Sequence, residues 1–297
     1  MIILKNLEKF NNFNEKIYKN DFNDNHLNII IKKNILDNSE IFFFTNINSN
    51  IKVLNFNSKN LSNVKFLEKM ILKKLEILYL DNNKISDIYF LEKVKFEGLK
   101  ELYLHGNNIS NIDVLEKVNF PNLETIDLSN NKIIKIDIFE KVKFTKLKVL
   151  SLHKSKISNI DKLNKVNFEF LEILTLSQNE VIKDISPLKG VKFPYLKHLF
   201  LSTINLIKID IFDSVKFENL KVLSFGGNNI SKINFLSKVD FKELETLFMH
   251  DNLISDIEVL GEVNYPKLIA LNLASNSITN IEVLQKVNFP ILCSLEL

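Results

Sequence analysis

Three histidines recur at matching places in a repeated pattern, and histidine is a common metal ligand. His105, His153 and His250 occupy one position in the third, fifth and ninth copies of the pattern. If the copies stack as parallel strands about 4.8 Å apart, His105 and His153 lie roughly 10 Å apart and His250 lies far beyond. Ligands of one zinc ion each lie about 2 Å from the metal. We therefore predict scattered surface histidines, with no metal site and no cofactor.

The other candidates for chemistry are a thiol, a glycine pair and a serine–aspartate pair. Cys293 lies in the last, incomplete copy, and no histidine occupies a position beside it that could activate the thiol. This argues against a catalytic nucleophile. Gly226 and Gly227 lack the following Lys-Ser/Thr and helix of a phosphate-binding loop, so a tight turn is favoured. Asp127 and Ser151 fall on adjacent strands, but no histidine lies between them to form a relay. The sequence predicts a protein that is not an enzyme.

Residues 99–122 contain the pattern that most of the chain repeats. Leu102 and Leu104 alternate with polar or aromatic residues as in a half-buried strand, and Asn107 ends that strand. Similar units start every 24 residues, with one interval of 25. Their first residues are Ile51, Leu75, Leu99, Leu123, Leu147, Leu171, Leu196, Leu220, Leu244, Leu268 and Leu292. We therefore predict a repeat array over 51–297, with ten full units and a partial eleventh.

The opening of each unit fits the L-x-x-L-x-L-x-x-N-x-L consensus, and the chain resembles the leucine-rich-repeat family. The resemblance implies an α/β solenoid, a right-handed horseshoe with a parallel β-sheet on its concave side and short helices on its convex side. It also implies that Asn107 turns inward and that its amide bonds unpaired backbone groups between coils. The equivalents of Asn107 are Asn83, Asn131, Asn179, Asn228, Asn252 and Asn276. The pattern departs at Lys59, Ser155 and Ile204, and at Ile204 we expect an altered turn with Asn205 as the substitute.

The second half of each unit is expected to form about two helical turns. Asp113 and its equivalents are good N-cap residues, and Asp113 with Glu116 has the spacing of a capping box. Pro187 suits the first helical position. Phe120 and the aromatic residues at the same repeat position are expected to fill the core before the next strand.

Residues 1–50 do not fit the repeat. Phe10, Phe13, Ile17 and Tyr18 have the spacing of one face of a short helix. The runs 29–31 and 41–44 indicate short buried strands, as in degenerate repeats. Because a solenoid exposes its core at each end, we interpret 1–50 as an N-terminal cap or as degenerate repeats.

Composition narrows the range of partners and locations. The 297 residues carry a formal net charge of +3, and lysines of the outer face are interleaved with glutamates, so no nucleic-acid stripe is expected. Strict alternation of Lys and Glu at the second residue of successive units, from Lys52 to Lys197, predicts a ladder of ion pairs that breaks at Lys221. No apolar run is long enough to span a bilayer and no secretory signal is evident. We expect no membrane insertion and, with a single cysteine, a cytoplasmic protein.

The inner face of the expected sheet is the most informative surface. Its aromatic side chains alternate with the core leucines, and exposed aromatic residues are typical of interfaces. Their β-propensity is the alternative explanation. The expected partner-binding residues are Tyr79, Glu101, Tyr103, His105, Asp127, Val149, Ile173, His198, Phe200, Val222, Phe248 and His250. The face carries charges of both signs, so the sequence indicates no preference for a charged partner.

A face of ten strands, nearly 50 Å long, suits a folded protein or an extended peptide better than a small molecule. We therefore predict a non-catalytic scaffold for protein–protein interaction. The run Asn-x-Ile-x-x-Ile-x-x-Leu resembles internalins and the repeat-built regulatory subunit of protein phosphatase 1, which use shorter units. The alternatives are a regulatory subunit of an enzyme such as a phosphatase, or a fragment of an internalin-like surface adhesin. Self-association through the C-terminal end at Leu297, a short gene product and a truncated fragment also stay open.

Overall fold

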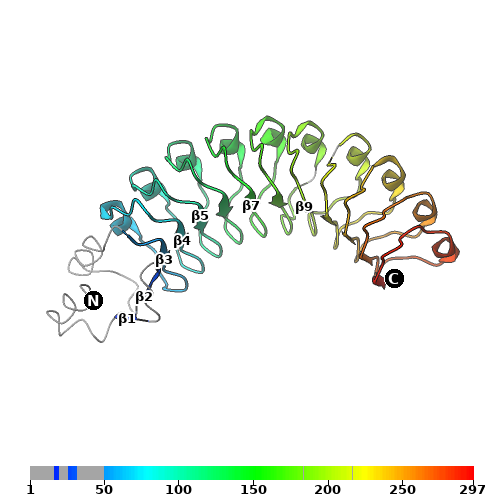
Figure 1. The fold of residues 1–297 in the computed structure, drawn as a ribbon, viewed down its shortest axis with the longest axis horizontal. Coiled ribbons are helices and arrows are strands. Elements are labelled where there is room, and N and C mark those ends of the chain that lie inside the picture. The colour runs from blue at the N-terminus through cyan, green and yellow to red at the C-terminus, as the bar shows by residue number, and fades with distance from the viewer. Residues whose placement is uncertain (1–16, 20–25, 32–49, 183, 216) are drawn as a thin grey trace. The chain divides into compact units, whose positions relative to one another are not determined.

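The computed structural model describes residues 17–19, 26–31, 50–182, 184–215 and 217–297. The chain divides into two compact units, Met1–Lys132 (unit 1) and Ile133–Leu297 (unit 2). Within each unit the described chain winds into successive coils, with strands along one side and short helices along the other (Figure 1).

The sheet of unit 1 is parallel from its second strand onward. Its strands are β1 (Ile17–Lys19), β2 (His26–Ile31), β3 (Val53–Asn55), β4 (Ile77–Tyr79), β5 (Glu101–Tyr103) and β6 (Thr125–Asp127). Strand β1 runs antiparallel to β2, and β2 pairs in parallel with β3. Leu54, Leu78 and Leu102 lie beside one another in register. The repeat length therefore fixes which side chains face the core.

Unit 2 has the same arrangement. Its strands are β7 (Val149–Ser151), β8 (Ile173–Thr175), β9 (His198–Phe200), β10 (Val222–Ser224), β11 (Thr246–Phe248), β12 (Ala270–Asn272) and β13 (Ser294–Glu296). Consecutive strands pair in parallel, and register is kept across the longer repeat, where Leu174 lies beside Leu199. The extra residue of that repeat lies in the turn after Asn179, in which the N–H of Ile182 bonds the Asn179 carbonyl and Val181 is exposed. The insertion is thus absorbed outside the sheet.

The helices of the described residues are 3₁₀-helices of four or five residues, so the expectation of two helical turns was too long. They are η1 (Lys65–Lys69), η2 (Tyr89–Glu92), η3 (Asp113–Glu116), η4 (Asp137–Glu140), η5 (Asp161–Lys165), η6 (Ser186–Gly190), η7 (Asp210–Ser214), η8 (Asn234–Lys238), η9 (Glu258–Gly261) and η10 (Glu282–Gln285). In η3 the N–H of Leu115 bonds the carbonyl of Ile112, a spacing of three. A 3₁₀-helix advances about 2.0 Å per residue and so spans a coil with few residues.

The predicted N-caps were wrong by position. Asp113 is the first residue of η3, and the N-cap is Ile112, whose side chain makes no capping bond. Asp113 and Glu116 therefore do not occupy capping-box positions. The cap comes from Asn111, whose Oδ1 accepts the N–H of Asp113 at 2.7 Å. The same bond joins Asn63 to Lys65, Asp87 to Tyr89, Asn159 to Asp161, Asp184 to Ser186, Asp256 to Glu258, and Asn280 to Glu282.

The turn asparagines form the buried ladder that the family resemblance implied. The Nδ2 of Asn107 donates to the carbonyls of Leu80 and Leu104, each at 3.0 Å. Its Oδ1 accepts the N–H of Ile85 at 3.0 Å. Asn107 is 6% exposed, so water does not replace these bonds. Each amide thereby ties one coil to the coil before it.

Two of the coils that lack the asparagine, those of Lys59 and Ile204, have the same altered turn conformation. The Oδ1 of Asn83 accepts the N–H groups of both Lys59 and Leu61. The Oδ1 of Asn228 accepts those of Ile204 and Leu206, each at 3.0 Å. The residues flanking both departures have positive φ angles, namely Ser58, Asn60, Thr203 and Asn205. In a regular turn the asparagine of the next coil accepts one such N–H, as Asn107 does from Ile85, so in these two turns it accepts one more.

The altered turn predicted at Ile204 is present, but Asn205 does not substitute for the missing asparagine. The side chain of Asn205 is exposed, and its Nδ2 donates to the carbonyl of Glu180 in the preceding coil. Ile204 itself is fully buried. Pro187 is the second residue of η6, one place later than predicted.

The aromatic residues at the predicted repeat position fill the core, except Phe289 in the last coil, which is half-buried. Phe96, Phe120 and Phe241 are 0–2% exposed. Tyr265 replaces phenylalanine in one coil, and its hydroxyl donates to the carbonyl of Leu236 at 2.9 Å. Burial raises the pKa of that phenol, which keeps it neutral. A buried tyrosine fits here because its polar atom has a partner.

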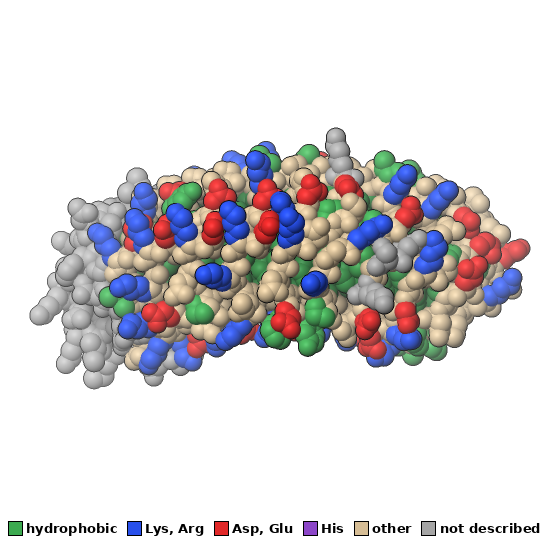
Figure 2. Space-filling model, turned by 90° about the horizontal axis from the view of Figure 1, so that it is seen from above, with side chains coloured by type: hydrophobic (Ala, Val, Ile, Leu, Met, Phe, Trp, Pro, Cys, Tyr) green, Lys and Arg blue, Asp and Glu red, His purple; other side chains and the backbone are tan. Residues whose placement is uncertain are grey.

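The charge ladder is present on either side of the predicted break. In unit 1 Glu76 lies between Lys100 at 2.8 Å and Lys52 at 2.9 Å, and the bonds from these lysines lower the pKa of its carboxyl. In unit 2 Lys197 pairs with Glu172, and Lys221 with Glu245. Lys197 and Lys221, which follow one another in the ladder, are thus each paired with a glutamate on the strand away from the other lysine. Figure 2 shows basic and acidic side chains interleaved on the helix side of the coils.

The predictions for 1–50 are tested only in part. Ile17 and Tyr18 lie in strand β1, so the predicted helix is wrong at these residues. Residues 29–31 lie in strand β2, as predicted. Phe10, Phe13 and the run 41–44 lie outside the described residues.

Candidate functional site

Strands β4, β5 and β6 bring tyrosines and carboxylates together on the inner, solvent-facing side of the unit 1 sheet. Tyr79 lies beside Tyr103, which in turn lies beside Asp127. The two tyrosine rings stack with centroids 4.8 Å apart and an interplanar angle of 13°. The hydroxyl of Tyr103 donates to the Glu101 carboxylate at 2.8 Å. With Asp81, which follows β4, these residues form the tyrosine–carboxylate patch.

Hydrogen bonds hold the two aspartates of the patch in place. Asp81 accepts the N–H of His105 at 2.9 Å and the Nδ2 of Asn57 at 3.0 Å, one on each carboxylate oxygen. Asp127 accepts the N–H of Ser129 at 2.8 Å. Because these carboxylates are already ordered, a partner that meets them loses little additional side-chain entropy from this face.

The patch is an electronegative environment. Burial raises the pKa of Asp81, and the nearby charge of Asp127 raises it further against the opposing hydrogen bonds. Burial and the Glu101 carboxylate also raise the pKa of Tyr103, and burial raises that of Tyr79, so both phenols stay protonated at neutral pH. Among the described residues, no ion pair involves Asp81, Glu101 or Asp127.

We expect Asp127→Asn to lower the pKa of Asp81 toward its usual value, because the substitution removes a neighbouring negative charge and keeps an oxygen for the Ser129 N–H. A raised folded-state pKa means that Asp81 contributes stability below its unfolded pKa, and that this contribution is lost as pH rises through the folded pKa. The variant should therefore lose less stability between acidic and neutral pH. A carboxyl ¹³C NMR titration measures the shift, with Asp113→Asn on the helix side as control; an unchanged Asp81 would disprove the coupling.

Strands β9, β10 and β11 of unit 2 present uncharged side chains, among them phenylalanines and a histidine. Phe200 and Phe248 lie on either side of Ser224 in register. Ser224 is buried, and its Oγ lies 2.6 Å from the Oγ of Ser202. The ring of His198 packs edge-on against Phe200, with centroids 6.3 Å apart, and burial lowers the pKa of this histidine. These residues could contact an apolar or aromatic group.

The glycine pair at the end of β10 serves close packing and a turn. A Cβ on Gly226 would overlap the ring of His250, which lies against this backbone. Gly227 has a φ of +66°, the left-handed region that glycine tolerates best. His250 is also bonded to the adjacent Asp251, with Nδ1 and Oδ2 2.8 Å apart. The structure thus supports the tight turn predicted for these glycines.

The predicted binding residues fall into two separate groups. Unit 1 carries Tyr79, Glu101, Tyr103, His105 and Asp127, and unit 2 carries Val149, Ile173, His198, Phe200, Val222, Phe248 and His250. All twelve are half-buried, so none is sealed in the core. Val53 and Ser224 occupy the same strand positions as some of these residues but are buried, at 9% and 6% exposure.

Sequence reasoning missed where the most exposed aromatic residues lie. Phe170 and Tyr195 are 44% and 48% exposed and stack with centroids 5.9 Å apart, just before β8 and β9. Both are the last residue of a repeat, so their shared position was the signal in the sequence. Tyr89, in η2 on the helix side, is 45% exposed. Exposure alone therefore does not distinguish the strand face.

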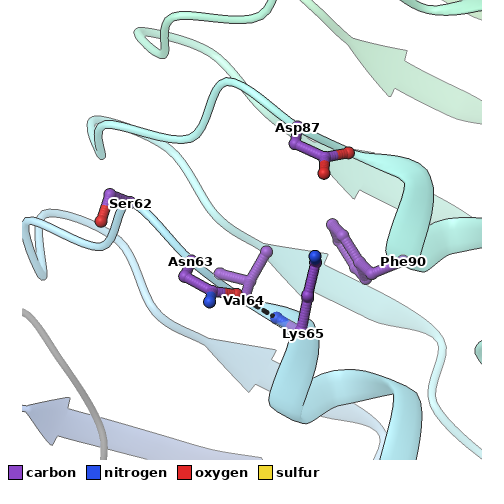
Figure 3. Close-up of a pocket in the computed structure, with 6 residues that line it drawn as sticks. All are labelled: Ser62, Asn63, Val64, Lys65, Asp87 and Phe90. Carbon is purple, nitrogen blue, oxygen red and sulfur yellow. Dashed lines mark hydrogen bonds between the residues drawn. The ribbon is translucent and has the colours of Figure 1, made fainter.

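Away from the strand faces, the described residues offer little that could bind a small ligand. A pocket of about 210 Å³ lies between η1 and η2, lined by residues that include Asn63, Lys65, Asp87 and Phe90 (Figure 3). Its volume is below that of usual ligand pockets, about 300–1,000 Å³. The described residues contain no group of three metal-ligating side chains and no helix of the length and apolarity needed to cross a membrane. Cys293 is an exposed free thiol.

The repeated coil of strand, buried asparagine turn and 3₁₀-helix defines this chain as a solenoid. A family model that spans two consecutive leucine-rich repeats matches residues 97–141, 121–165 and 218–262. The chain carries leucine-rich repeats over these residues and has the leucine-rich-repeat fold. No curated protein matches its sequence.

Solved structures of other proteins share the fold. An internalin, InlF, from Listeria monocytogenes is 24% identical with a TM-score of 0.59, covering 90% of this chain and 85% of its own. The Arabidopsis receptor kinase HAESA is 22% identical with a TM-score of 0.60, covering 77% of this chain and 39% of its own. The functional domain of InlJ from Listeria monocytogenes is 16% identical with a TM-score of 0.51, covering 84% and 63%. At these identities the likeness concerns the fold alone.

Proposed function

We propose that this protein is a non-catalytic scaffold that binds a protein or peptide through the inner, solvent-facing sides of its sheets. The observation that carries this proposal is the stacked Tyr79–Tyr103 pair, half-buried beside three carboxylates that form no ion pair in the described residues. Aromatic residues ordered on an open surface are typical of binding hot spots. The uncharged face around Phe200 and Phe248 offers a second contact region of different chemistry.

The comparisons support this class of function in a general way. Leucine-rich-repeat proteins commonly mediate protein–protein interaction. The structure of HAESA contains a peptide hormone, IDA, and a co-receptor, SERK1. The fold thus occurs in a protein that engages both a peptide and a protein. A regulatory subunit, an internalin-like adhesin, self-association through the C-terminal coil and a cytoplasmic location stay predictions.

We expect Tyr103→Ala and Phe200→Ala each to reduce partner capture about tenfold, as loss of a hot-spot aromatic of roughly 1.4 kcal/mol would do. The measurement is affinity purification from the native cell lysate with the tagged full chain, followed by quantitative mass spectrometry. Matched controls are Tyr89→Ala and Tyr195→Ala, which remove tyrosines that are more exposed but lie off the strand faces. Capture that survives the first pair and is lost with the controls would place the interface elsewhere.

The same variants separate binding from packing. Leu104, next to Tyr103, is fully buried, and Leu104→Ala should cost about 2–5 kcal/mol of folding stability. Tyr103→Ala should cost much less, because its ring is half-buried and its hydroxyl bonds one carboxylate. Equal losses of melting temperature would make Tyr103 a packing residue.

A further inference from the structure

The tyrosine–carboxylate patch differs in charge from the chain that carries it. The chain has a net charge of +3, whereas the solvent-facing positions of β4, β5 and β6, with the residue two places after each strand, hold three carboxylates and no lysine or arginine. Lys84 lies further along the turn after β4. The corresponding positions of β7 to β12 in unit 2 hold no lysine, arginine, aspartate or glutamate, and β13 adds one carboxylate, Glu296. The negative charge is therefore concentrated in the part of the strand faces that also carries the stacked tyrosines.

The carboxylates of the patch have acceptor capacity left over. A carboxylate can accept about four hydrogen bonds. The described residues give Asp127 one donor, from Ser129, and give Glu101 one donor, from Tyr103. Asp81 has one donor on each oxygen. These bonds set the orientation of each group, and the remaining lone pairs can meet a donor from outside.

Negative charge beside an aromatic face favours one kind of side chain in particular. A guanidinium group bonds a carboxylate through two parallel N–H groups and stacks on an aromatic ring with its flat face. A lysine ammonium is a strongly hydrated point charge and gains less from a planar ring. Cations within about 6 Å of a tyrosine centroid are attracted by the ring itself. Tyr103 offers both kinds of contact, because Asp127 lies beside it in register and Glu101 bonds its hydroxyl.

We propose that the tyrosine–carboxylate patch, formed by Tyr79, Asp81, Glu101, Tyr103 and Asp127, binds an arginine side chain of a peptide or protein partner. This inference rests on the proposed function, since it names the chemistry of the partner that unit 1 receives. The arginine lies against the tyrosine pair and bonds the carboxylates of Asp127 and Glu101. Charge complementarity speeds the encounter and orients the partner, and the aromatic contact adds affinity.

The test uses the full chain and three labelled peptides: Gly-Gly-Arg-Gly-Arg-Gly-Gly, the same peptide with citrulline in place of arginine, and the same peptide with lysine in place of arginine. Citrulline keeps the shape of arginine and lacks its charge. Fluorescence anisotropy at about 0.15 M salt, where the Debye length is about 8 Å, limits long-range attraction to the protein as a whole. We expect the arginine peptide to bind at least tenfold more tightly than the citrulline peptide and than a lysine peptide of the same length.

Variants locate the binding. Asp127→Asn and Glu101→Gln should each weaken binding of the arginine peptide about three- to tenfold, and both together more than either alone. Asp113→Asn makes the same chemical change on the helix side of unit 1 and should leave binding unchanged.

The fold of the Asp127→Asn variant is checked separately. The asparagine keeps the bond from the Ser129 N–H, so circular dichroism should show an unchanged melting temperature or a higher one.

Three results would overturn the arginine assignment: equal affinity for the citrulline peptide, equal affinity for the lysine peptide, or equal weakening by Asp113→Asn and Asp127→Asn. The proposed function is tested separately by lysate capture. If the arginine peptide does not bind and Tyr103→Ala still releases the captured partner, the interaction face stands and the arginine assignment falls. If Tyr103→Ala releases nothing, the interaction face of unit 1 falls as well.

Discussion

Asn107→Ala should lower the free energy of unfolding by about 2–6 kcal/mol, because it leaves the N–H of Ile85 buried without its partner. It also removes one of two side-chain donors from each of the carbonyls of Leu80 and Leu104, at about 0.5–1.5 kcal/mol for each bond lost. Each buried group without a bond costs about 1–3 kcal/mol. Chemical denaturation measures the loss. Because each coil of a solenoid contacts only its neighbours, hydrogen exchange should quicken first at the N–H of Ile85 and in the adjoining coils.

The neighbouring residue provides a matched control. The backbone N–H of Asn108 bonds the carbonyl of Ile85, and this bond survives truncation of the side chain. Asn108→Ala should therefore change stability by less than about 0.5 kcal/mol, as usual for a site without a buried network. If both alanine variants destabilise the protein equally, the amide ladder does not hold the coils together.

Phe212→Ala should be the most damaging single truncation in unit 2, with an expected loss of about 3–5 kcal/mol. The ring of Phe212 is fully buried and lies 5.2 Å from Phe225, 5.6 Å from Phe235 and 6.3 Å from Phe217 between ring centroids. Its removal opens a cavity and ends three aromatic contacts, of which those with Phe225 and Phe235 join neighbouring coils. Urea denaturation followed by circular dichroism gives the size of the effect.

Phe170 offers a control of the same residue type in the same unit. It is 44% exposed and stacks on Tyr195 alone among the described ring contacts. Phe170→Ala should lose about 0.5–1.5 kcal/mol, the range of a single aromatic pair. A loss as large as that of Phe212→Ala would mean that the exposed stack contributes as much as the core.

The repeat could be predicted from the sequence because its period is an unusually strong signal. Leucines at alternate positions and an asparagine at a fixed distance place the strand, the turn and the core of each coil, and Leu102 and Asn107 occupy the predicted places. The extra residue after Asn179 did not disturb the register, because a turn can lengthen without changing which side chains pair in the sheet. Periodicity determines the face of a residue more securely than it determines the length of a helix.

The helix type and its caps could not be predicted in the same way. Asp113 is a good N-cap by residue type, and so is Asn111 two places earlier, so composition alone did not decide between them. A helix of four residues satisfies its ends by bonds of spacing three, which the pattern of leucines and valines does not distinguish from one α-helical turn. Asn111, which lies closer to the asparagine turn, accepts the N–H of Asp113 and so caps the helix.

The sequence could predict which residues lie on the interaction face, but not the contacts that their side chains make. The sequence placed Tyr79 and Tyr103 on one face, and the structure adds that their rings stack and that the hydroxyl of Tyr103 bonds Glu101. The sequence indicated mixed charge over the whole array. Asp81, Glu101 and Asp127 are confined to unit 1, which becomes clear only when the coils are placed in register.

The shared acceptors of Asn83 and Asn228 restrict how such an array can drift. Lys59, Ser155 and Ile204 depart from the turn asparagine, and the coil that follows each of them keeps it, at Asn83, Asn179 and Asn228. At Lys59 and Ile204 that following amide serves the N–H groups of the defective turn directly. Two successive coils without the amide would have no such neighbour. An isolated loss of the turn asparagine is therefore tolerated because the next coil supplies an acceptor. Loss of the asparagine from two consecutive coils would remove that acceptor.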